Sequence, residues 1–538
     1  MEIWEEKETL SWSAFRTSGI VFATISVPKV GGCGEVQFSQ GAKAVGTVIA
    51  IPEKSLNACP AAAESDASSW SGFDSAAIST SIVVAVVLRF WRLGSPSEPV
   101  YDETKVLTQA QSFLHGWRPP YSSHPPFGKL VVALSVRLFG DSPWGWRAVN
   151  ALIGTALVPI TYLLARRLFR SSLAASIAAL LLLCEGMFLI ASRLAMINIV
   201  YITTGAWAYL VLWRFVQDPR PRTRRIELAA MGLMLGLCVS TKAAISELAV
   251  LLALSVVALT LADPVSTLSF SSLTNFATKR VIGACGLVLG LVLLVYLTVF
   301  LVFDWVVWHG IGGFVAYHEH VIQHNLDFPA SFPNASPFWS WPLLLHAYAY
   351  WNKNPLNGTV EVLWCGGNPL LWWAIIPAVL IAGVRGYTHK SMPWIFVTAG
   401  YLANIAMWIP IHRYLFIYSY MPALYFGLLA LSGDLQECWT GNARRWEHFL
   451  LLAPLLPCLI LGLRLMWAGL AVFSISIAYL VLSRRLEHWD GKFVCLIFLF
   501  VTLLTFVYFL PLWVDIPISQ TGYASRMWLN GSGLASWL

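Results

Sequence analysis

From residue 75 onward, long apolar stretches alternate along the chain with short polar loops. Most of these stretches are about 16–23 residues long, which is the length that a helix needs to cross a bilayer. They lie near residues 75–93, 147–165, 171–190, 198–213, 226–241, 243–262, 281–303, 369–384, 392–410, 414–431, 448–463, 465–482 and 493–512. The pattern predicts an all-α polytopic membrane protein with about 11–13 transmembrane helices.

The first 74 residues do not share this pattern. Residues 1–74 are rich in Ser, Ala and Gly and show no sustained helical or strand period. They also lack the basic segment, apolar core and cleavage site that mark a signal peptide. We therefore expect a poorly ordered N-terminal extension, followed by a single transmembrane domain over residues 75–538.

Basic residues predict the orientation of this domain. Arginines and lysines gather in alternate loops, at 166–170, 214–225, 279–280, 385–390, 444–445 and 484–492. Loops of this kind stay in the cytoplasm. The two longest loops, 94–146 and 304–368, are then external, and we predict a multi-pass protein of the plasma membrane whose active site faces the outside or the periplasm.

Composition agrees with this class and excludes others. The chain is 57% hydrophobic and only 12% charged, whereas a soluble domain carries roughly 25% charged residues. The net charge of +7 comes from the short loops, with no basic stripe for nucleic acid. The nine cysteines have neither zinc spacing nor a disulfide framework.

The first external loop carries most of the candidate chemistry. Asp102 and Glu103 lie near its start, and the run from His124 to Lys129 (HPPFGK) follows about twenty residues later. An isolated Asp-Glu pair is more often half of an ordinary ion pair than a catalytic site. Here a proline-stiffened turn, an amphipathic helix expected over 128–139 and Arg147 favour a site for a lipid-linked substrate.

Arg89 lies near the end of the first span. Two further cations occur in or beside apolar stretches: Arg193 follows the third span, and Lys242 ends the fifth. An ionisable residue near membrane depth costs a few kcal/mol and usually marks a partner or a pathway. The alternative for each is snorkelling to the headgroups. Together with Arg147, they could bind a lipid-linked phosphate and stabilise it as a leaving group.

Other polar and aromatic residues receive simpler interpretations. His318, Glu319, His320 and His324 could suggest a metal centre, but their spacing does not complete a zinc site. We predict no metal site, and expect this segment to line the groove that binds the acceptor. Tyr418 is expected to pack or to anchor the chain at the membrane interface.

Several segments resemble, in order, those of the protein O-mannosyltransferases, which are dolichyl- or polyprenyl-phosphate-mannose:protein mannosyltransferases with the GT-C fold. The resemblance covers about residues 75–528 and is most specific where HPPFGK follows Tyr-Asp-Glu. The segments are Arg89, Asp102-Glu103, His124 to Lys129, Trp146-Arg147, Ser192-Arg193, Gly232 to Lys242, Ser340-Trp-Pro342, Gly367 to Trp373 and Arg413 to Leu424.

Two departures refine the resemblance. Members of the family often have Asp where this chain has Asn198, so that position is not expected to be catalytic. The 304–368 loop is too short for the MIR domain of eukaryotic members. The chain is therefore similar to the shorter bacterial type, which implies a polyprenyl-phosphate carrier.

The resemblance implies inverting transfer of mannose from polyprenyl-phosphate-mannose to Ser or Thr hydroxyls of secreted or membrane proteins. Asp102 would be the base, and Glu103 would orient peptide or sugar. No cofactor is implied, and dependence on a divalent cation is left open. Donor phosphate and sugar would be bound by Arg89, His124, Lys129, Arg147, Arg193 and Lys242.

Two other functions stay open at this stage. A related GT-C enzyme could use a lipid or glycan acceptor, although HPPFGK favours protein. A transporter would usually show internal repeats and a site near the bilayer midplane. The chain shows no such repeat, and its polar residues cluster at one face.

Overall fold

A computed structural model describes residues 12–17, 20–25, 70–118, 124–218, 220–242, 250–254, 277–326, 334–354, 358–411, 414–463, 490–530 and 536–537. The chain divides into two units, Met1–Ala62 and Ala63–Leu538. In the first unit, strands β1 (Trp12–Thr17) and β2 (Ile20–Ile25) pair antiparallel. Most of the predicted N-terminal extension lies outside the described residues.

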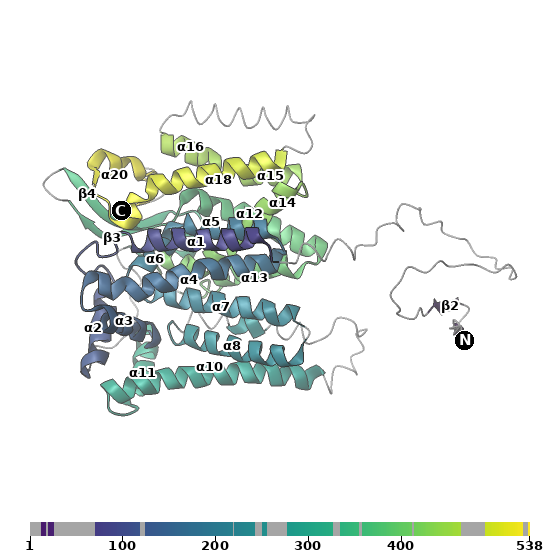
Figure 1. Cartoon of the computed structure of the whole chain (residues 1–538), viewed down its shortest axis with the longest axis horizontal. Helices are drawn as coiled ribbons and strands as arrows, with labels where there is room; N and C mark the ends of the chain where they lie inside the picture. Colours follow the sequence, from purple (N-terminus) through teal and green to yellow (C-terminus); the bar gives the residue numbers. More distant parts are fainter. Residues whose placement is uncertain are drawn as a thin grey trace, which may run out of the picture. The chain divides into compact units, whose positions relative to one another are not determined.

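The second unit is built around long apolar helices that lie side by side (Figure 1). Within the described residues, six helices are long and apolar enough to cross a bilayer. A seventh span is possible if α5 (Ser172–Leu183) and α6 (Gly186–Arg193), which meet at 62°, are counted together. The six are α1 (Gly72–Phe90), α4 (Pro143–Phe169), α7 (Asn198–Gln217), α10 (Ala277–Val307), α12 (Pro369–His389) and α18 (Asp490–Phe509).

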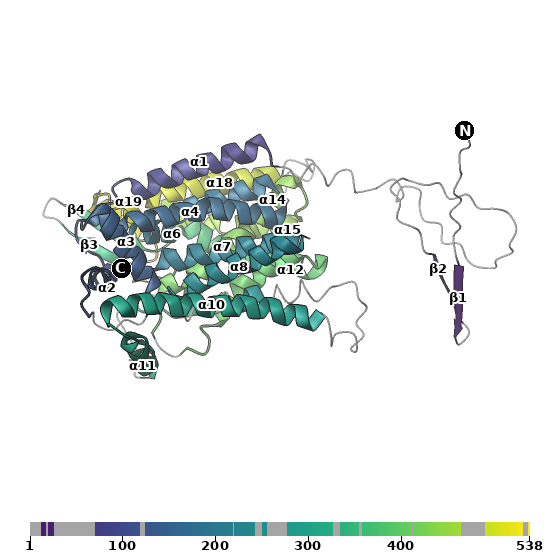
Figure 2. The same ribbon diagram turned by 60° about the horizontal axis from the view of Figure 1, so that its bottom comes forward.

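Further helices, two of them about as long as α1 and α7, occupy several of the other predicted spans. They are α8 (Pro221–Val239), α13 (Met392–Ala406), α14 (Met421–Thr440), α15 (Arg445–Leu452) and α16 (Leu455–Leu463). Helix α8 packs between α7 and α10 (Figure 2), and α14 packs against α12, α13 and α18. Of the predicted spans, 243–262 lies mostly and 465–482 wholly outside the described residues, so the total of about 11–13 stays a prediction.

The bend between α5 and α6 has a clear chemical cause. Glu185 is fully buried there and caps α6 by accepting the Phe188 N–H at 3.0 Å. It also accepts the Trp372 Nε1–H at 2.8 Å and the Asn368 N–H at 3.2 Å. A Cβ on Gly367 would lie 1.9 Å from the Glu185 carboxylate, so only glycine allows this approach. The carboxylate thereby joins α6 to the start of α12.

A small sheet adds to the predicted all-α architecture. Strands β3 (His346–Lys353) and β4 (Thr359–Cys365) form an antiparallel hairpin in the second long loop. Short strands β5 (Ile518–Ser519) and β6 (Ser536–Trp537), both after the last long helix, extend it to the order β5-β4-β3-β6. The C-terminal segment is thus hydrogen-bonded to the second long loop.

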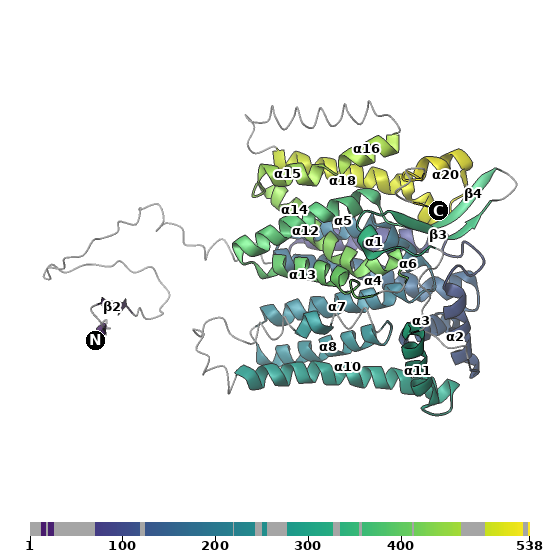
Figure 3. The ribbon, with the colours of Figure 1, turned by 180° about the vertical axis from the view of Figure 1, so that it is seen from behind.

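The two long loops meet at one end of the helical bundle (Figures 1 and 3). The first forms α2 (Glu103–His115) and α3 (Phe127–Phe139), and α3 confirms the helix predicted over 128–139. The second contributes α11 (Gly312–Leu326) and the β3–β4 hairpin. Their common end agrees with the prediction that both loops lie on one side of the membrane.

Candidate active site

Asp102 stands at the start of α2, where the chain leaves the loop that follows α1. Its side chain does not cap the helix, and 32% of it is exposed. Among the described residues, it forms an ion pair with Lys105 at 3.1 Å, and the lysine side chain is 81% exposed. Such an exposed pair contributes at most about 1 kcal/mol. The carboxylate is therefore accessible and weakly held, as a base that must meet a substrate hydroxyl requires.

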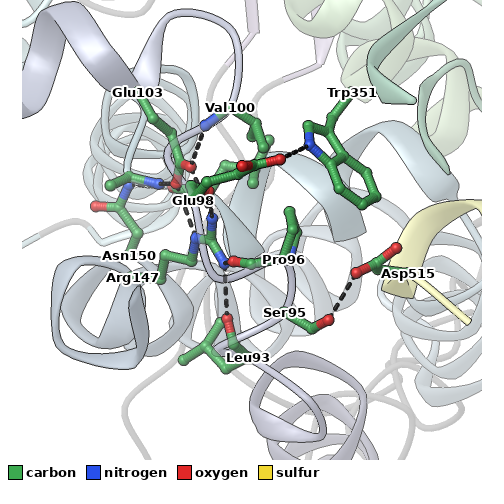
Figure 4. A network of polar contacts seen from close by, with 12 residues as sticks. Leu93, Ser95, Pro96, Glu98, Val100, Glu103, Arg147, Asn150, Trp351 and Asp515 are labelled. Carbon is green, nitrogen blue, oxygen red and sulfur yellow. Dashed lines mark hydrogen bonds and ion pairs between the residues drawn. The ribbon is translucent and has the colours of Figure 1, made fainter. Parts of the chain in front are cut away.

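Glu103, the next residue, has the opposite environment (Figure 4). It is fully buried and accepts two hydrogen bonds from Arg147, at 2.9 and 2.8 Å. The Val100 and Ala195 amides donate to it at 3.0 and 2.5 Å. The prediction that Glu103 orients peptide or sugar is thus not supported, because its carboxylate is occupied by protein donors.

Arg147 also makes all its hydrogen bonds to protein groups. Its Nε–H and one terminal N–H bind Glu103, and the other terminal groups donate to the carbonyls of Leu93, Pro96 and Glu98 at 3.2, 2.8 and 3.2 Å. A guanidinium has five N–H groups, and each of these five has an acceptor. Arg147 is also fully buried. It therefore shapes the loop between α1 and α2, and phosphate binding would require it to give up a protein contact.

Arg193 closes the end of α1. Its guanidinium donates to the carbonyls of four residues in the last turn and just beyond it: Leu88, Arg89, Trp91 and Arg92, at 2.6–3.1 Å. A cation in this place satisfies carbonyls that the helix leaves without partners and complements its dipole. The structure thus gives Arg193, like Arg147, a role in holding the loop before Asp102.

Arg89 is enclosed between α1, α4 and α6. Only 1% of it is exposed, and its Nε–H donates to Ser192 at 3.3 Å. Gly154 makes room for this contact, since a Cβ there would lie 2.1 Å from Ser192 Oγ. Neither terminal nitrogen of Arg89 has a hydrogen-bond partner within the described residues. The predicted contact of Arg89 with the donor therefore needs an opening that this structure does not show.

The HPPFGK segment docks against the end of α8. The Phe127 N–H donates to the Ser240 carbonyl at 3.0 Å. At Gly128 a Cβ would lie 2.6 Å from Ile197 Cγ2 and 3.1 Å from Thr241 Cγ2. Glycine is required here because the start of α3 touches the chain just before Lys242. The motif thus places α3 beside another predicted site residue.

Lys129 points back to the proline turn. Its ammonium donates to the carbonyl of His124, and only 5% of the residue is exposed. Burial lowers the pKa of Lys129 to about 7, because a charged amine is poorly solvated there. The two ends of the motif are thus joined, and the charge of the lysine changes near neutral pH.

Lys242 lies just beyond α8 and is also buried, with 7% exposed. Its Nζ sits 5.0 Å from the centre of the Tyr418 ring and 5.3 Å from that of Tyr201. The Asn198 side-chain oxygen is 3.4 Å away, a weak hydrogen bond. Aromatic faces and an amide oxygen all favour a cation at this position.

Tyr418 connects Lys242 with Asp102. The Asp102 carboxylate is close enough to act electrostatically on the Tyr418 phenol, and Lys242 Nζ lies 5.0 Å from the centre of the same ring. Phe416 stacks on Tyr418 with ring centres 5.5 Å apart. Tyr101 packs on Tyr350 of β3 at 4.9 Å. The site is therefore walled by aromatic rings from three distant segments, and the sequence interpretation of Tyr418 as a packing residue missed its position.

The structure places two of the histidines of the second loop, His318 and His320, away from any metal centre among the described residues. Residues 318 and 320 lie in α11, a helix, where residues two apart point to different faces. His318 contacts the Tyr296 hydroxyl at 3.2 Å and the Phe314 carbonyl at 2.7 Å. Among the described residues, no group of three His, Cys, Asp or Glu side chains could hold a metal ion. The side chain of His324 lies outside them.

Solved structures share this fold. The Saccharomyces cerevisiae Pmt1–Pmt2 protein O-mannosyltransferase complex bound to its sugar donor matches with a TM-score of 0.67 and 14% identity, covering 88% of this chain and 94% of that one. ArnT from Cupriavidus metallidurans bound to undecaprenyl phosphate matches with a TM-score of 0.51 and 16% identity, covering 81% and 77%. The fold is that of a GT-C membrane glycosyltransferase.

The family is narrower than the fold. The chain belongs to the protein O-mannosyltransferases: residues 79–309 match the dolichyl-phosphate-mannose-protein mannosyltransferase family, and residues 311–532 match the C-terminal four-transmembrane region of protein O-mannosyltransferases. The polyprenol-phosphate-mannose–protein mannosyltransferase of Mycobacterium tuberculosis is 24% identical over 83% of this chain and 90% of its own length. That of Corynebacterium glutamicum is 24% identical over 69% and 84%.

Proposed function

We propose that this protein transfers mannose from polyprenyl-phosphate-mannose to Ser or Thr hydroxyls of proteins, at the external face of the plasma membrane. One observation supports this most directly. The Tyr418 phenol lies within electrostatic range of the accessible Asp102 carboxylate, and the Lys242 ammonium lies 5.0 Å from the centre of the Tyr418 ring. A base and a cation that both lie near one aromatic residue can serve the two ends of a single displacement.

Asp102 is the base in this proposal. The acceptor oxygen forms a bond to the anomeric carbon while its proton passes to the Asp102 carboxylate. An alkyl hydroxyl is a poor acid, so proton removal must accompany bond formation. A single displacement inverts the anomeric centre and needs one carboxylate on the acceptor face, which suits a site where the neighbouring Glu103 is buried.

The leaving group is a phosphate that takes the electrons of the broken bond. It already carries charge and needs cations rather than a general acid. Lys242 is the main candidate, because it is a buried ammonium beside the ring of Tyr418, the residue that also lies near Asp102. Lys129 is the second, since α3 docks beside Lys242 through Gly128. The satisfied guanidiniums of Arg147 and Arg193 instead hold the loop that carries Asp102.

Transfer to protein can be tested directly. Purified protein in nanodiscs would receive radiolabelled polyprenyl-phosphate-mannose and delipidated secreted proteins of the host. We expect label in protein, released by β-elimination as expected for a Ser or Thr linkage. Label that appears only in extracted lipid or glycan would contradict a protein acceptor and favour the related GT-C activity.

The external site needs its own test. A cysteine placed at His115, exposed at the end of α2, should react with an impermeant maleimide in intact cells. A cysteine at Arg222, near the start of α8, should react only after lysis. The opposite labelling pattern would reverse the proposed orientation.

A further inference from the structure

The loop between α1 and Asp102 is fastened from outside the first half of the chain. Ser95 Oγ–H donates to the Asp515 carboxylate at 2.6 Å. The Arg92 guanidinium donates to the Asp515 main-chain carbonyl at 2.8 Å. Asp515 directly follows α19 (Pro511–Val514), beyond the last long helix. A residue more than four hundred positions later therefore holds the loop that leads to the proposed base.

The β3–β4 hairpin makes a second fastening (Figure 4). Trp351 Nε1–H of β3 donates to the Glu98 carboxylate at 2.5 Å. The Trp351–Glu98 contact is exposed, whereas the Ser95–Asp515 contact is partly buried and Asp515 itself is only 2% exposed. Hydrogen bonds in water-accessible places are readily replaced by water, while a buried one is costly to lose. Of the two contacts, the one with Asp515 should control the loop more strongly.

Asp515 has two energetically unfavourable features. Its backbone φ is +56°, a value that L-residues rarely adopt. Its second carboxylate oxygen is buried with no hydrogen-bond partner within the described residues. A buried carboxyl in a strained backbone persists when its surroundings require it. Here the requirement we can identify is the pair of contacts to Ser95 and Arg92.

We propose that Asp515 is a positioning residue for mannosyl transfer, which acts through Ser95 to fix the loop before Asp102. The inference rests on the proposed function, because it takes Asp102 as the base. The loop from Leu93 to Val100 then has supports from both halves of the molecule: Arg147 binds its carbonyls from α4, and Asp515 binds the Ser95 side chain from the C-terminal segment.

Three variants test the Ser95–Asp515 hydrogen bond: two remove it and one keeps it. Asp515→Ala and Ser95→Ala each delete the hydrogen bond, while Asp515→Asn keeps an acceptor oxygen for Ser95. The Arg92 contact uses the main chain and survives in all three. We expect Asp515→Ala and Ser95→Ala to lower kcat about 10- to 100-fold with little change in KM for the lipid donor, because a misplaced base slows the chemical step. Asp515→Asn should retain most of the wild-type kcat.

A matched control separates positioning from stability. Asp304, at the end of α10, is as buried as Asp515 and accepts the Phe314 N–H of α11 at 2.6 Å. Asp304→Ala should lower Tm as Asp515→Ala does, yet leave kcat within about twofold. Hydrogen exchange of the amides from 93 to 103 gives a readout besides activity. Exchange there should increase in Asp515→Ala and not in Asp304→Ala.

The outcomes distinguish the two proposals. If wild-type protein transfers mannose to protein and Asp515→Ala keeps its kcat, or loses it no more than Asp304→Ala does, the positioning role is wrong and the proposed function stands. If wild-type protein transfers no mannose to protein, the proposed function fails. Faster exchange at 93–103 in Asp515→Ala would then still establish the fastening of the loop, though not its role in catalysis.

Discussion

Two adjacent carboxylates on the first long loop have opposite environments. Glu103 is fully buried and receives four hydrogen bonds from protein donors, two of them from Arg147. Asp102 is about one-third exposed and makes one exposed ion pair. A carboxylate saturated with donors resists change, whereas a weakly held one is free to accept a proton from a substrate. The comparison separates the residue that shapes the site from the residue that acts in it.

The same division extends to the cations. Arg193 donates to main-chain carbonyls at the end of α1, and Arg147 donates to carbonyls in the loop that leads to Asp102. Lys242 instead lies against the rings of Tyr201 and Tyr418. One region, around Glu103 and Arg147, is a saturated polar framework. The other, around Asp102, Tyr418 and Lys242, keeps groups for ligands, and the following substitutions test that division.

The largest effect is expected at Asp102. Asp102→Asn keeps the shape of the side chain but removes the base, so kcat should fall about 10²–10⁴-fold. Donor binding and Tm should change little, because the one ion pair lost is exposed. Mannose incorporation and thermal unfolding measure the two quantities. Asp141→Asn is the control, because Asp141 is an exposed carboxylate of the same loop, between α3 and α4. Near-normal turnover by folded Asp102→Asn would show that another group is the base.

Substitutions around Glu103 and Arg147 should mainly lower the stability of the folded protein. Arg147→Met leaves the Glu103 carboxylate buried without its partner, and such a loss costs about 3–5 kcal/mol. Thermal unfolding should show a marked fall in Tm. Replacing both residues, with Glu103→Leu added, removes the orphaned charge and should recover part of the loss. A normal Tm for Arg147→Met combined with a raised donor KM would instead return Arg147 to the phosphate site that the sequence suggested.

The helices could be predicted from the sequence better than the roles of the site residues. Apolar periodicity predicted the long helices, and the amphipathic pattern predicted α3 to within one residue, because both are local properties. The β3–β4 hairpin in the second long loop was not predicted. The positions of Tyr418 and Asp515 were also missed, since their contacts with the first loop join segments hundreds of residues apart, which one sequence does not reveal.

Roles were harder to predict because charge alone does not reveal a partner. The arginines and the lysine beside apolar stretches had equal claims to the donor phosphate. Only the geometry shows that main-chain carbonyls already occupy Arg147 and Arg193, while Lys242 faces rings. Which of two adjacent carboxylates is buried was equally hidden, since it depends on where α4 places its arginine.

A smaller effect is expected at Lys242. Lys242→Met should raise the apparent KM for polyprenyl-phosphate-mannose about 10- to 150-fold, since a hydrogen bond to a charged group is worth roughly 1.5–3 kcal/mol. KM for the acceptor should change much less. Lys353→Met, at the exposed end of β3, controls for loss of positive charge at this end of the molecule. If Lys242→Met keeps its donor KM and kcat, the phosphate does not bind there.

The smallest and most specific effect concerns pH at Lys129, whose pKa burial lowers to about 7. If its ammonium assists the donor, donor affinity should fall as pH rises from 6 to 8. Stability should move the other way. The folded protein releases this proton near pH 7, while the unfolded chain holds it to about 10.4, so the free energy of unfolding rises with pH across that interval. Lys129→Met should abolish this part of both trends, and donor KM and Tm measured from pH 6 to 9 test it. If donor KM and Tm depend on pH in the same way in wild type and Lys129→Met, the lysine does not titrate in this range. Lys129 would then not belong with the groups kept for ligands.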